Sequence, residues 1–195
     1  MLTVRQIERE WEAKAHDRLF GRLVAARPEA ALRLGIDTNR PVPVAAMAII
    51  RLDELSQSHV KVYPKLVRTI LAAEQADGGW GDVVATTICL RALLCGDGNG
   101  LAIERGLRYL ADLQKPEGTW PNVPIRRMPA DPYLSALVLY QLGNQPKFRQ
   151  AVRLADAVQW FTANEARLDD ETRELWHRAR TRCRVPVAMP APCLC

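Results

Sequence analysis

The chain is 195 residues long, with 48% hydrophobic residues, 25% charged residues and a formal net charge of +5. This composition can bury a hydrophobic core, so it excludes disorder as a description of the whole chain and favours a single folded domain. Arginine supplies most of the positive charge, but a net charge of +5 is too mild to predict a dedicated nucleic-acid-binding protein.

Export and membrane insertion are not favoured by the sequence. The first ten residues alternate charged and apolar side chains and lack the apolar centre of a secretory signal. The longest apolar run, residues 41–50, lies between two arginines and is too short to cross a bilayer. Five cysteines are an odd number, which favours reduced thiols. We therefore expect a cytoplasmic protein without a transmembrane segment.

The strongest pattern is an internal repeat, in which residues 65–80 align without gaps on residues 105–120 at an offset of 40 residues. Apolar residues recur at helical spacing over residues 103–111 while the positions between them are polar, which predicts an amphipathic helix. A glycine follows in each copy, Gly78 and Gly118, where helices commonly end in a residue with positive φ. The repeat therefore predicts two similar helix–turn units.

Each copy is followed by a helix of a different kind. Residues 83–95 carry one charge and residues 133–142 carry none, which is typical of a helix that is buried on most sides. Asp131 is placed to cap the second of these helices, with Pro132 at its first position. Amphipathic outer helices thus alternate with apolar inner helices, which predicts an all-α fold of antiparallel helix pairs in two layers.

The flanks continue this alternation. Residues 45–55 are predicted as an earlier inner helix, residues 148–162 as a later outer helix, and residues 7–34 as one or two amphipathic helices. Residues 166–184 are predicted as a charged helix, because acids precede bases in the order that suits the helix dipole.

These assignments give one all-α domain over residues 1–185, with its repeat core over residues 65–143. The last ten residues, 186–195, contain three prolines and are expected to be a flexible tail.

The second copy reads Arg105-Gly106-x-x-Tyr109, followed by Gln114-x-x-x-Gly118-x-Trp120, and is a complete match to the QW repeat. The sequence therefore resembles the squalene-hopene and oxidosqualene cyclases and, more distantly, the β subunits of protein prenyltransferases. This resemblance implies a partial α/α toroid, in which the glutamine bonds backbone groups near the next inner helix and the tryptophan stacks against it. It also implies structural roles for Glu74, Gly78, Trp80, Gln114, Gly118 and Trp120.

Catalysis in the cyclases uses an aspartic acid in an Asp-x-Asp-Asp-Thr-Ala segment at the start of an inner helix. The matching segments begin at Asp82 and Asp131, and both lack the two central acids. The resemblance makes these two residues catalytic candidates, whereas their position favours helix capping, so whether the chain is an enzyme is left open. The side chains expected in a ligand pocket are Thr86, Thr87, Tyr133 and Leu137.

Metal and cofactor sites are not predicted. The three histidines, His16, His59 and His177, have no ligand spacing, and no phosphate-binding loop is present. The acids at 169–171 are predicted to lie on a solvated helix face.

The resemblance and the absence of the family's catalytic residues lead to two expected functions. The favoured one is a protein that binds or processes an isoprenoid or another apolar ligand; the alternative is a catalytically inactive interaction protein. At 40 residues per unit the chain holds fewer than five units, whereas a ring of six needs about 240 residues. A partial ring exposes apolar faces, so we expect a homodimer or another protein partner.

Nucleic acid is the least favoured partner. Four arginines between Arg178 and Arg184 form the best anion site in the chain. Arg126 and Arg127, in an insertion over residues 123–129, are the alternative site for a diphosphate or a nucleic-acid backbone, but a solvated loop is the commoner arrangement.

Overall fold

The computed structural model describes residues 41–96 and 99–183. Within those ranges the fold is all-α, as predicted, and the only extended pairing is an isolated bridge between Pro121 and Ala130. In this part of the chain, no helix combines the length and the apolar character that crossing a bilayer requires. The predicted helices at 7–34 and the predicted tail at 186–195 lie outside the described residues.

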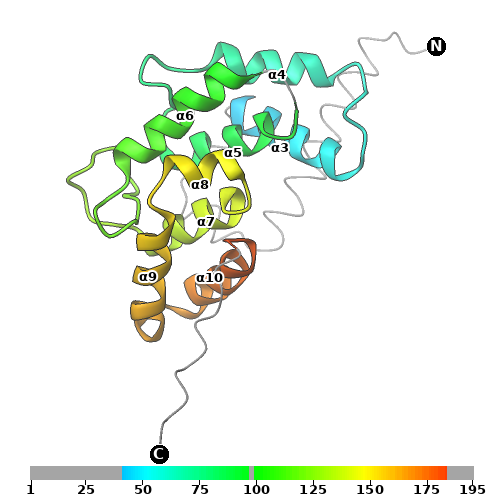
Figure 1. The fold of residues 1–195 in the computed structure, drawn as a ribbon. Coiled ribbons are helices and arrows are strands. Elements are labelled where there is room, and N and C mark those ends of the chain that lie inside the picture. Colours follow the sequence, from blue (N-terminus) through cyan, green and yellow to red (C-terminus); the bar gives the residue numbers. More distant parts are fainter. Residues whose placement is uncertain (1–40, 97–98, 184–195) are drawn as a thin grey trace, which may run out of the picture.

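The chain runs through short helices joined by turns (Figure 1). The elements are α3 (Pro41–Glu54), α4 (Tyr63–Ala72), α5 (Val83–Leu93), α6 (Gly100–Leu113), α7 (Pro132–Leu142), α8 (Pro146–Ala151), α9 (Leu154–Asn164), the 3₁₀ turn η1 (Glu165–Arg167) and α10 (Asp170–Cys183).

The helices alternate between two sets. Helices α3, α5, α7 and α10 pack side by side in that order, each against the next. Helix α4 packs on α3, α6 packs on α5, and α8 packs on α6. This order agrees with the predicted alternation of inner and outer helices, and closure into a toroid stays a prediction.

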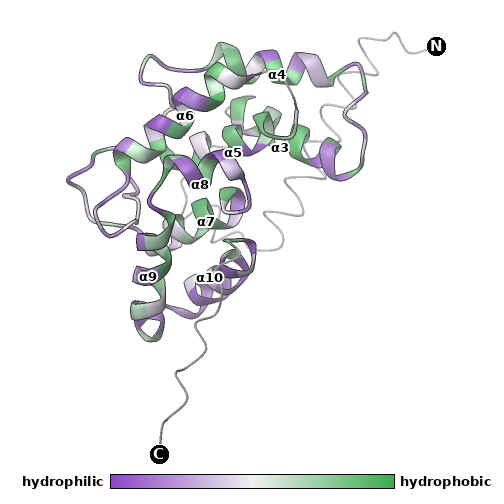
Figure 2. Cartoon of the chain, viewed as in Figure 1, coloured by the Kyte–Doolittle hydropathy of each residue, from purple (hydrophilic) through white to green (hydrophobic). Residues whose placement is uncertain are grey.

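Burial follows the same division, and Figure 2 shows the hydropathy of each helix. Every residue of α5 except Arg91 is buried, whereas α6 buries one side and α4 fully buries Ile70 alone. Helix α10 has the predicted order of acids before bases, but it is not simply a solvated helix. It buries Trp176, Ala179 and Cys183 along one face and packs against α7. Helix α10 therefore continues the row of α3, α5 and α7, although only one of its faces is buried.

One predicted helix is divided in two. Residues 148–162 were expected to form a single outer helix, but α8 ends at Ala151 and α9 begins at Leu154. The side chain of Gln114 binds the backbone between them: its Oε1 accepts from the Arg153 N–H at 2.8 Å, and its Nε2 donates to the Arg153 carbonyl at 3.2 Å. The helix is interrupted at a contact with a residue 39 positions earlier.

Candidate ligand-binding site

The tryptophans of the two repeat copies make the same bond. Trp80 Nε1 donates to the Ile70 carbonyl at 2.8 Å, and Trp120 Nε1 donates to the Leu110 carbonyl at 2.8 Å. Each acceptor lies ten residues earlier, at the end of the preceding outer helix. Both indoles are buried. Their hydrogen bonds join the first turn to α4 and the second turn to α6.

The backbone of each tryptophan is held by a hydroxyl group of the next inner helix. The Trp80 N–H donates to Thr86 Oγ1 at 2.9 Å, and the Trp120 N–H donates to Ser135 Oγ at 2.8 Å. Thr86 is fully buried, and its hydroxyl serves the turn rather than lining a pocket. Thr86 was predicted to line a ligand pocket, but its hydroxyl accepts the Trp80 N–H and it does not line the groove described below.

The insertion in the second turn is longer than the seven residues predicted over 123–129. The hydroxyl residue follows the tryptophan by six positions in the first copy and by 15 in the second, a difference of nine. The antiparallel bridge between Pro121 and Ala130 brings the two ends of the inserted segment together. The insertion therefore covers residues 122–130, not 123–129, and we call residues 122–130 the insertion loop.

Both candidate acids cap inner helices. The Asp82 side chain accepts from the Ala85 N–H at 2.7 Å, and the Asp131 side chain accepts from the Leu134 N–H at 3.0 Å. This is N-cap geometry, in which a carboxylate satisfies a backbone donor of the first helical turn. The structure therefore assigns each aspartate a structural role.

The repeat glycines allow each turn to approach the next outer helix. Gly78 and Gly118 have φ of 84° and 87°, in the region that favours glycine. A Cβ on Gly78 would lie 2.9 Å from the Arg105 backbone oxygen on α6. A Cβ on Gly118 would lie 2.2 Å from the Ala157 nitrogen on α9, so the second turn is the more tightly packed.

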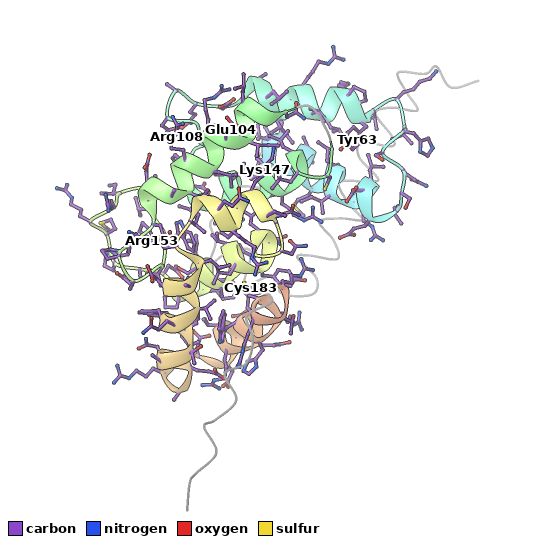
Figure 3. All side chains as sticks on the ribbon, viewed as in Figure 1. Tyr63, Glu104, Arg108, Lys147, Arg153 and Cys183 are labelled. Atoms are coloured by element: carbon purple, nitrogen blue, oxygen red, sulfur yellow. The ribbon has the colours of Figure 1, made fainter. Side chains whose placement is uncertain are left out.

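The residues at the glutamine position also reach the next outer helix. Glu74 accepts two bonds from the Arg105 guanidinium of α6, at 2.5 Å and 2.8 Å. Gln114 instead binds the backbone of Arg153 ahead of α9, where Figure 3 labels that side chain. Gln114 Nε2 also donates to the Gly118 carbonyl, at 2.9 Å, within its own turn. The side chain therefore joins this turn to the backbone between α8 and α9, and a bond near the next inner helix stays a prediction.

The ring of Trp120 lies beside Phe148 of α8, with ring centroids 6.2 Å apart and an interplanar angle of 29°. The indole of the second turn thus joins α6 to α8 through an aromatic contact.

Tyr109 covers the first turn. A Cβ on Gly79 would lie 2.7 Å from the Tyr109 ring, and the Tyr109 hydroxyl is buried without a hydrogen-bond partner among the described residues. Burial, followed by the charges of Asp77 and Asp82, raises the pKa of Tyr109 to about 12. The first turn is thus sealed by a neutral ring.

The second turn borders an open groove of about 590 Å³. The insertion loop and the start of α7 form one side, and the segment 167–172 around the start of α10 forms the other. Its apolar walls come from Val123, Met128, Pro132, Tyr133 and Leu168. Two predicted site residues, Asp131 and Tyr133, meet here.

The other predicted residues lie elsewhere. Thr87 is fully buried, and its hydroxyl donates to the Val83 carbonyl at 2.7 Å within α5. Leu137 is partly buried against the hydrophobic core. Neither lines the groove, and nor does Asp82.

The polar rim of the groove was missed from the sequence. Arg167, Asp169 and Thr172 come from a segment that is distant in sequence, so no local pattern joins them to the insertion loop. Asp169 accepts from the Thr172 N–H at 2.8 Å and caps α10, as Asp131 caps α7. Two carboxylates and one guanidinium therefore surround the apolar walls.

The thiols of Cys95 and Cys183 are partly and fully buried in the fold, respectively. Burial raises the pKa of Cys95 and of Cys183 to about 11 each, so both thiols stay protonated at neutral pH. Across residues 41–96 and 99–183, no group of three or more histidine, cysteine or acidic side chains is placed to hold a metal ion.

The predicted arginine cluster is partly engaged within the fold. Arg178 pairs with Glu174, and the Arg182 guanidinium lies 4.0 Å from the centre of the Tyr140 ring. Arg184 lies outside the described residues. These contacts weaken the case for a phosphate-binding surface on α10.

Comparisons of the chain with models of protein families, with curated proteins and with solved structures give no match.

Proposed function

We propose that this protein binds a neutral, apolar ligand of the isoprenoid type in the groove beside the insertion loop. The observation that carries this proposal is the groove itself, whose volume of about 590 Å³ falls in the range of small-molecule sites. Its walls are largely apolar, and Tyr133 adds an aromatic face. The isoprenoid class rests on the resemblance of the repeat to the QW motif.

The charges at the rim favour a ligand without a phosphate head. Asp131 and Asp169 stand against a single guanidinium, that of Arg167. A diphosphate placed here would meet two carboxylates at close range, and like charges repel more strongly near a low-dielectric wall. An isoprenoid alcohol or hydrocarbon meets no such repulsion.

Binding accounts for the site better than protonation does. A general acid must reach the reacting atom of the substrate with its proton. The Asp131 carboxyl already accepts the Leu134 N–H, and Asp82, the other candidate, lies outside the groove. We therefore assign the groove a holding role.

Native mass spectrometry with farnesol tests this proposal. We expect a retained one-to-one adduct, weaker retention of farnesyl diphosphate, and weaker retention of the unbranched alcohol dodecanol. Val123→Asp places a charge on the groove wall at an exposed position and should abolish the farnesol adduct, because an ion opposes apolar contact.

The matched control is Leu101→Asp, which makes the same change of charge at an exposed apolar residue of α6. It should leave the adduct intact. Absence of a farnesol adduct, or equal loss in the two variants, would falsify the groove as an isoprenoid site. Equal retention of dodecanol would overturn the isoprenoid class.

The second candidate is a catalytically inactive interaction protein that pairs with a second copy. It is favoured by the exposed apolar side chains of Val123 and Met128 beside the groove. Light scattering of the purified chain decides this: a dimer that Val123→Asp converts to a monomer supports pairing through the groove, and a monomeric wild type opposes it.

A further inference from the structure

The insertion loop gathers exposed apolar side chains. Across the described ranges, five large hydrophobic residues are exposed, and three of them, Val123, Ile125 and Met128, belong to this loop. Single exposed apolar residues are ordinary on protein surfaces, but clusters mark surfaces that bind a partner or a membrane. The loop projects from the body of the protein between α6 and α7 (Figure 1).

Two arginines stand among these apolar side chains. Arg126 and Arg127 are both exposed, and neither guanidinium has a hydrogen bond or ion pair with any residue that the structure describes. Arg105, by contrast, holds its guanidinium on Glu74. The loop thus presents unpaired cations beside apolar groups.

The backbone of the loop is fixed at several points. The Asp131 N–H donates to the Trp120 carbonyl at 2.9 Å and closes the base of the loop. The Met128 N–H donates to the Ile125 carbonyl at 2.9 Å, and Lys115 Nζ donates to the Arg126 carbonyl at 3.3 Å. These bonds fix the backbone of a loop whose residues 122–129 are all exposed.

We propose that the insertion loop docks on an anionic lipid bilayer, with Ile125 and its apolar neighbours entering the interface and Arg126 and Arg127 contacting lipid phosphates. A bilayer surface demands apolar contact and opposite charge, and no particular shape. A stable protein interface buries some 20–30 residues on each side, far more than a loop of nine residues supplies.

This surface shares Val123 and Met128 with the groove wall, but Ile125, Arg126 and Arg127 do not line the groove. The residues on which docking chiefly depends are these three, so docking does not depend on the ligand proposed above. The groove opens beside the base of the same loop, where Val123 and Met128 are both exposed and part of its wall. Docking would place the groove entrance near the lipid.

Sedimentation of the full chain with vesicles tests the proposal. The probes are vesicles of phosphatidylcholine mixed with phosphatidylglycerol and vesicles of phosphatidylcholine alone. We expect binding to the anionic vesicles, weaker binding to the neutral ones, and loss of binding as salt screens the charges. Arg126→Ser combined with Arg127→Ser should lower the partition coefficient by about fivefold for each arginine.

Ile125→Asp should lower the partition coefficient by at least about tenfold, since it removes apolar contact and adds a repelled charge. The matched controls lie on α6: Arg108→Ser, at an exposed residue labelled in Figure 3, and Leu101→Asp. Both should bind nearly as well as the wild type. Circular dichroism confirms that all variants are folded.

Three results would overturn docking through the loop. The wild type fails to bind anionic vesicles; or the loop variants bind as well as the wild type; or the α6 controls lose as much binding as the loop variants. A change of oligomeric state in the loop variants, without vesicle binding by the wild type, would assign the loop to a second copy instead. Farnesol retention by the arginine variants separates a failure of docking from a failure of the groove.

Discussion

The two repeat turns make the same framework and differ in what they expose. In each, an indole N–H bonds the preceding outer helix, and a hydroxyl of the next inner helix accepts the tryptophan N–H. The first turn is short and covered by Tyr109, whereas the second carries the insertion loop and borders the groove. The repeat motif therefore forms the scaffold, and the insertion into its second copy forms the candidate site.

Substitution of the repeat glycines should give the largest loss of folding stability, and the loss should be greater in the second turn. Gly118→Ala places a Cβ 2.2 Å from the Ala157 backbone and adds strain at positive φ, so it should lower the free energy of unfolding by about 3–5 kcal/mol. Gly78→Ala meets its nearest atoms at 2.9 Å and should cost about 2–3 kcal/mol. Urea denaturation measures both, and a larger cost at Gly78 would contradict the packing described.

The next largest difference in folding stability is expected between substitutions of Gln114 and Glu74, which occupy the same position of the repeat. Gln114→Ala leaves the Arg153 N–H without its partner and should lower the free energy of unfolding by about 2–3 kcal/mol. Glu74→Ala removes an ion pair whose arginine is half exposed, and should cost less than about 1 kcal/mol. Equal losses of the free energy of unfolding in urea denaturation would contradict this difference between the two side chains.

Tyr109 gives the first turn an alkaline signature. Its pKa is about 12 in the folded chain against 10.0 when unperturbed, so the folded state keeps a proton that the unfolded state releases. Stability should therefore fall by up to about 2 kcal/mol as pH rises from 10.0 towards 12.

Tyr109→Phe should remove this fall and leave stability at neutral pH within about 0.5 kcal/mol, because the hydroxyl has no partner to lose. Tyrosinate absorbance against pH should lose its last component in this variant. An unchanged alkaline limb of the titration would place the high pKa on another residue.

Substitution of the two helix-capping aspartates should have nearly equal effects on folding stability. Asp82→Ala and Asp131→Ala should each lower the free energy of unfolding by about 1 kcal/mol, and substitution by Asn should cost only a few tenths, since Asn also caps. Thermal unfolding at neutral pH measures the four variants. A cost for Asp131→Asn well above that for Asp82→Asn would reveal a further role for the groove carboxyl.

The parts of the fold that were foreseen are those with local signals. The apolar runs of α5 and α7 indicated buried helices, and Asp131-Pro132 marked the start of the second. The stripe of Thr172, Trp176 and Cys183 on α10 has helical spacing as well, but the many charged residues between these positions give the helix a low mean hydropathy.

The features that were missed depend on contacts between distant residues. The break before Arg153 is set by Gln114, and the groove forms where the insertion loop meets the start of α10. The nine-residue length of the insertion already follows from the matching Asp82 and Asp131, which lie 49 positions apart against the 40 of the repeat. The bridge between Pro121 and Ala130 that closes its base does not follow from the sequence. The local periodicity of the sequence does not indicate contacts between such distant residues.

The most direct test of the shared framework is hydrogen exchange at the two indole N–H groups after the insertion is removed. The variant deletes residues 122–130 and carries Pro121→Gly, because the matching residue, Gly81, has a φ of 100° that proline does not adopt. We predict slow exchange at both Trp80 and Trp120, at the wild-type rates. Fast exchange at Trp120 with continued protection at Trp80 would contradict the claim that the two turns share one framework.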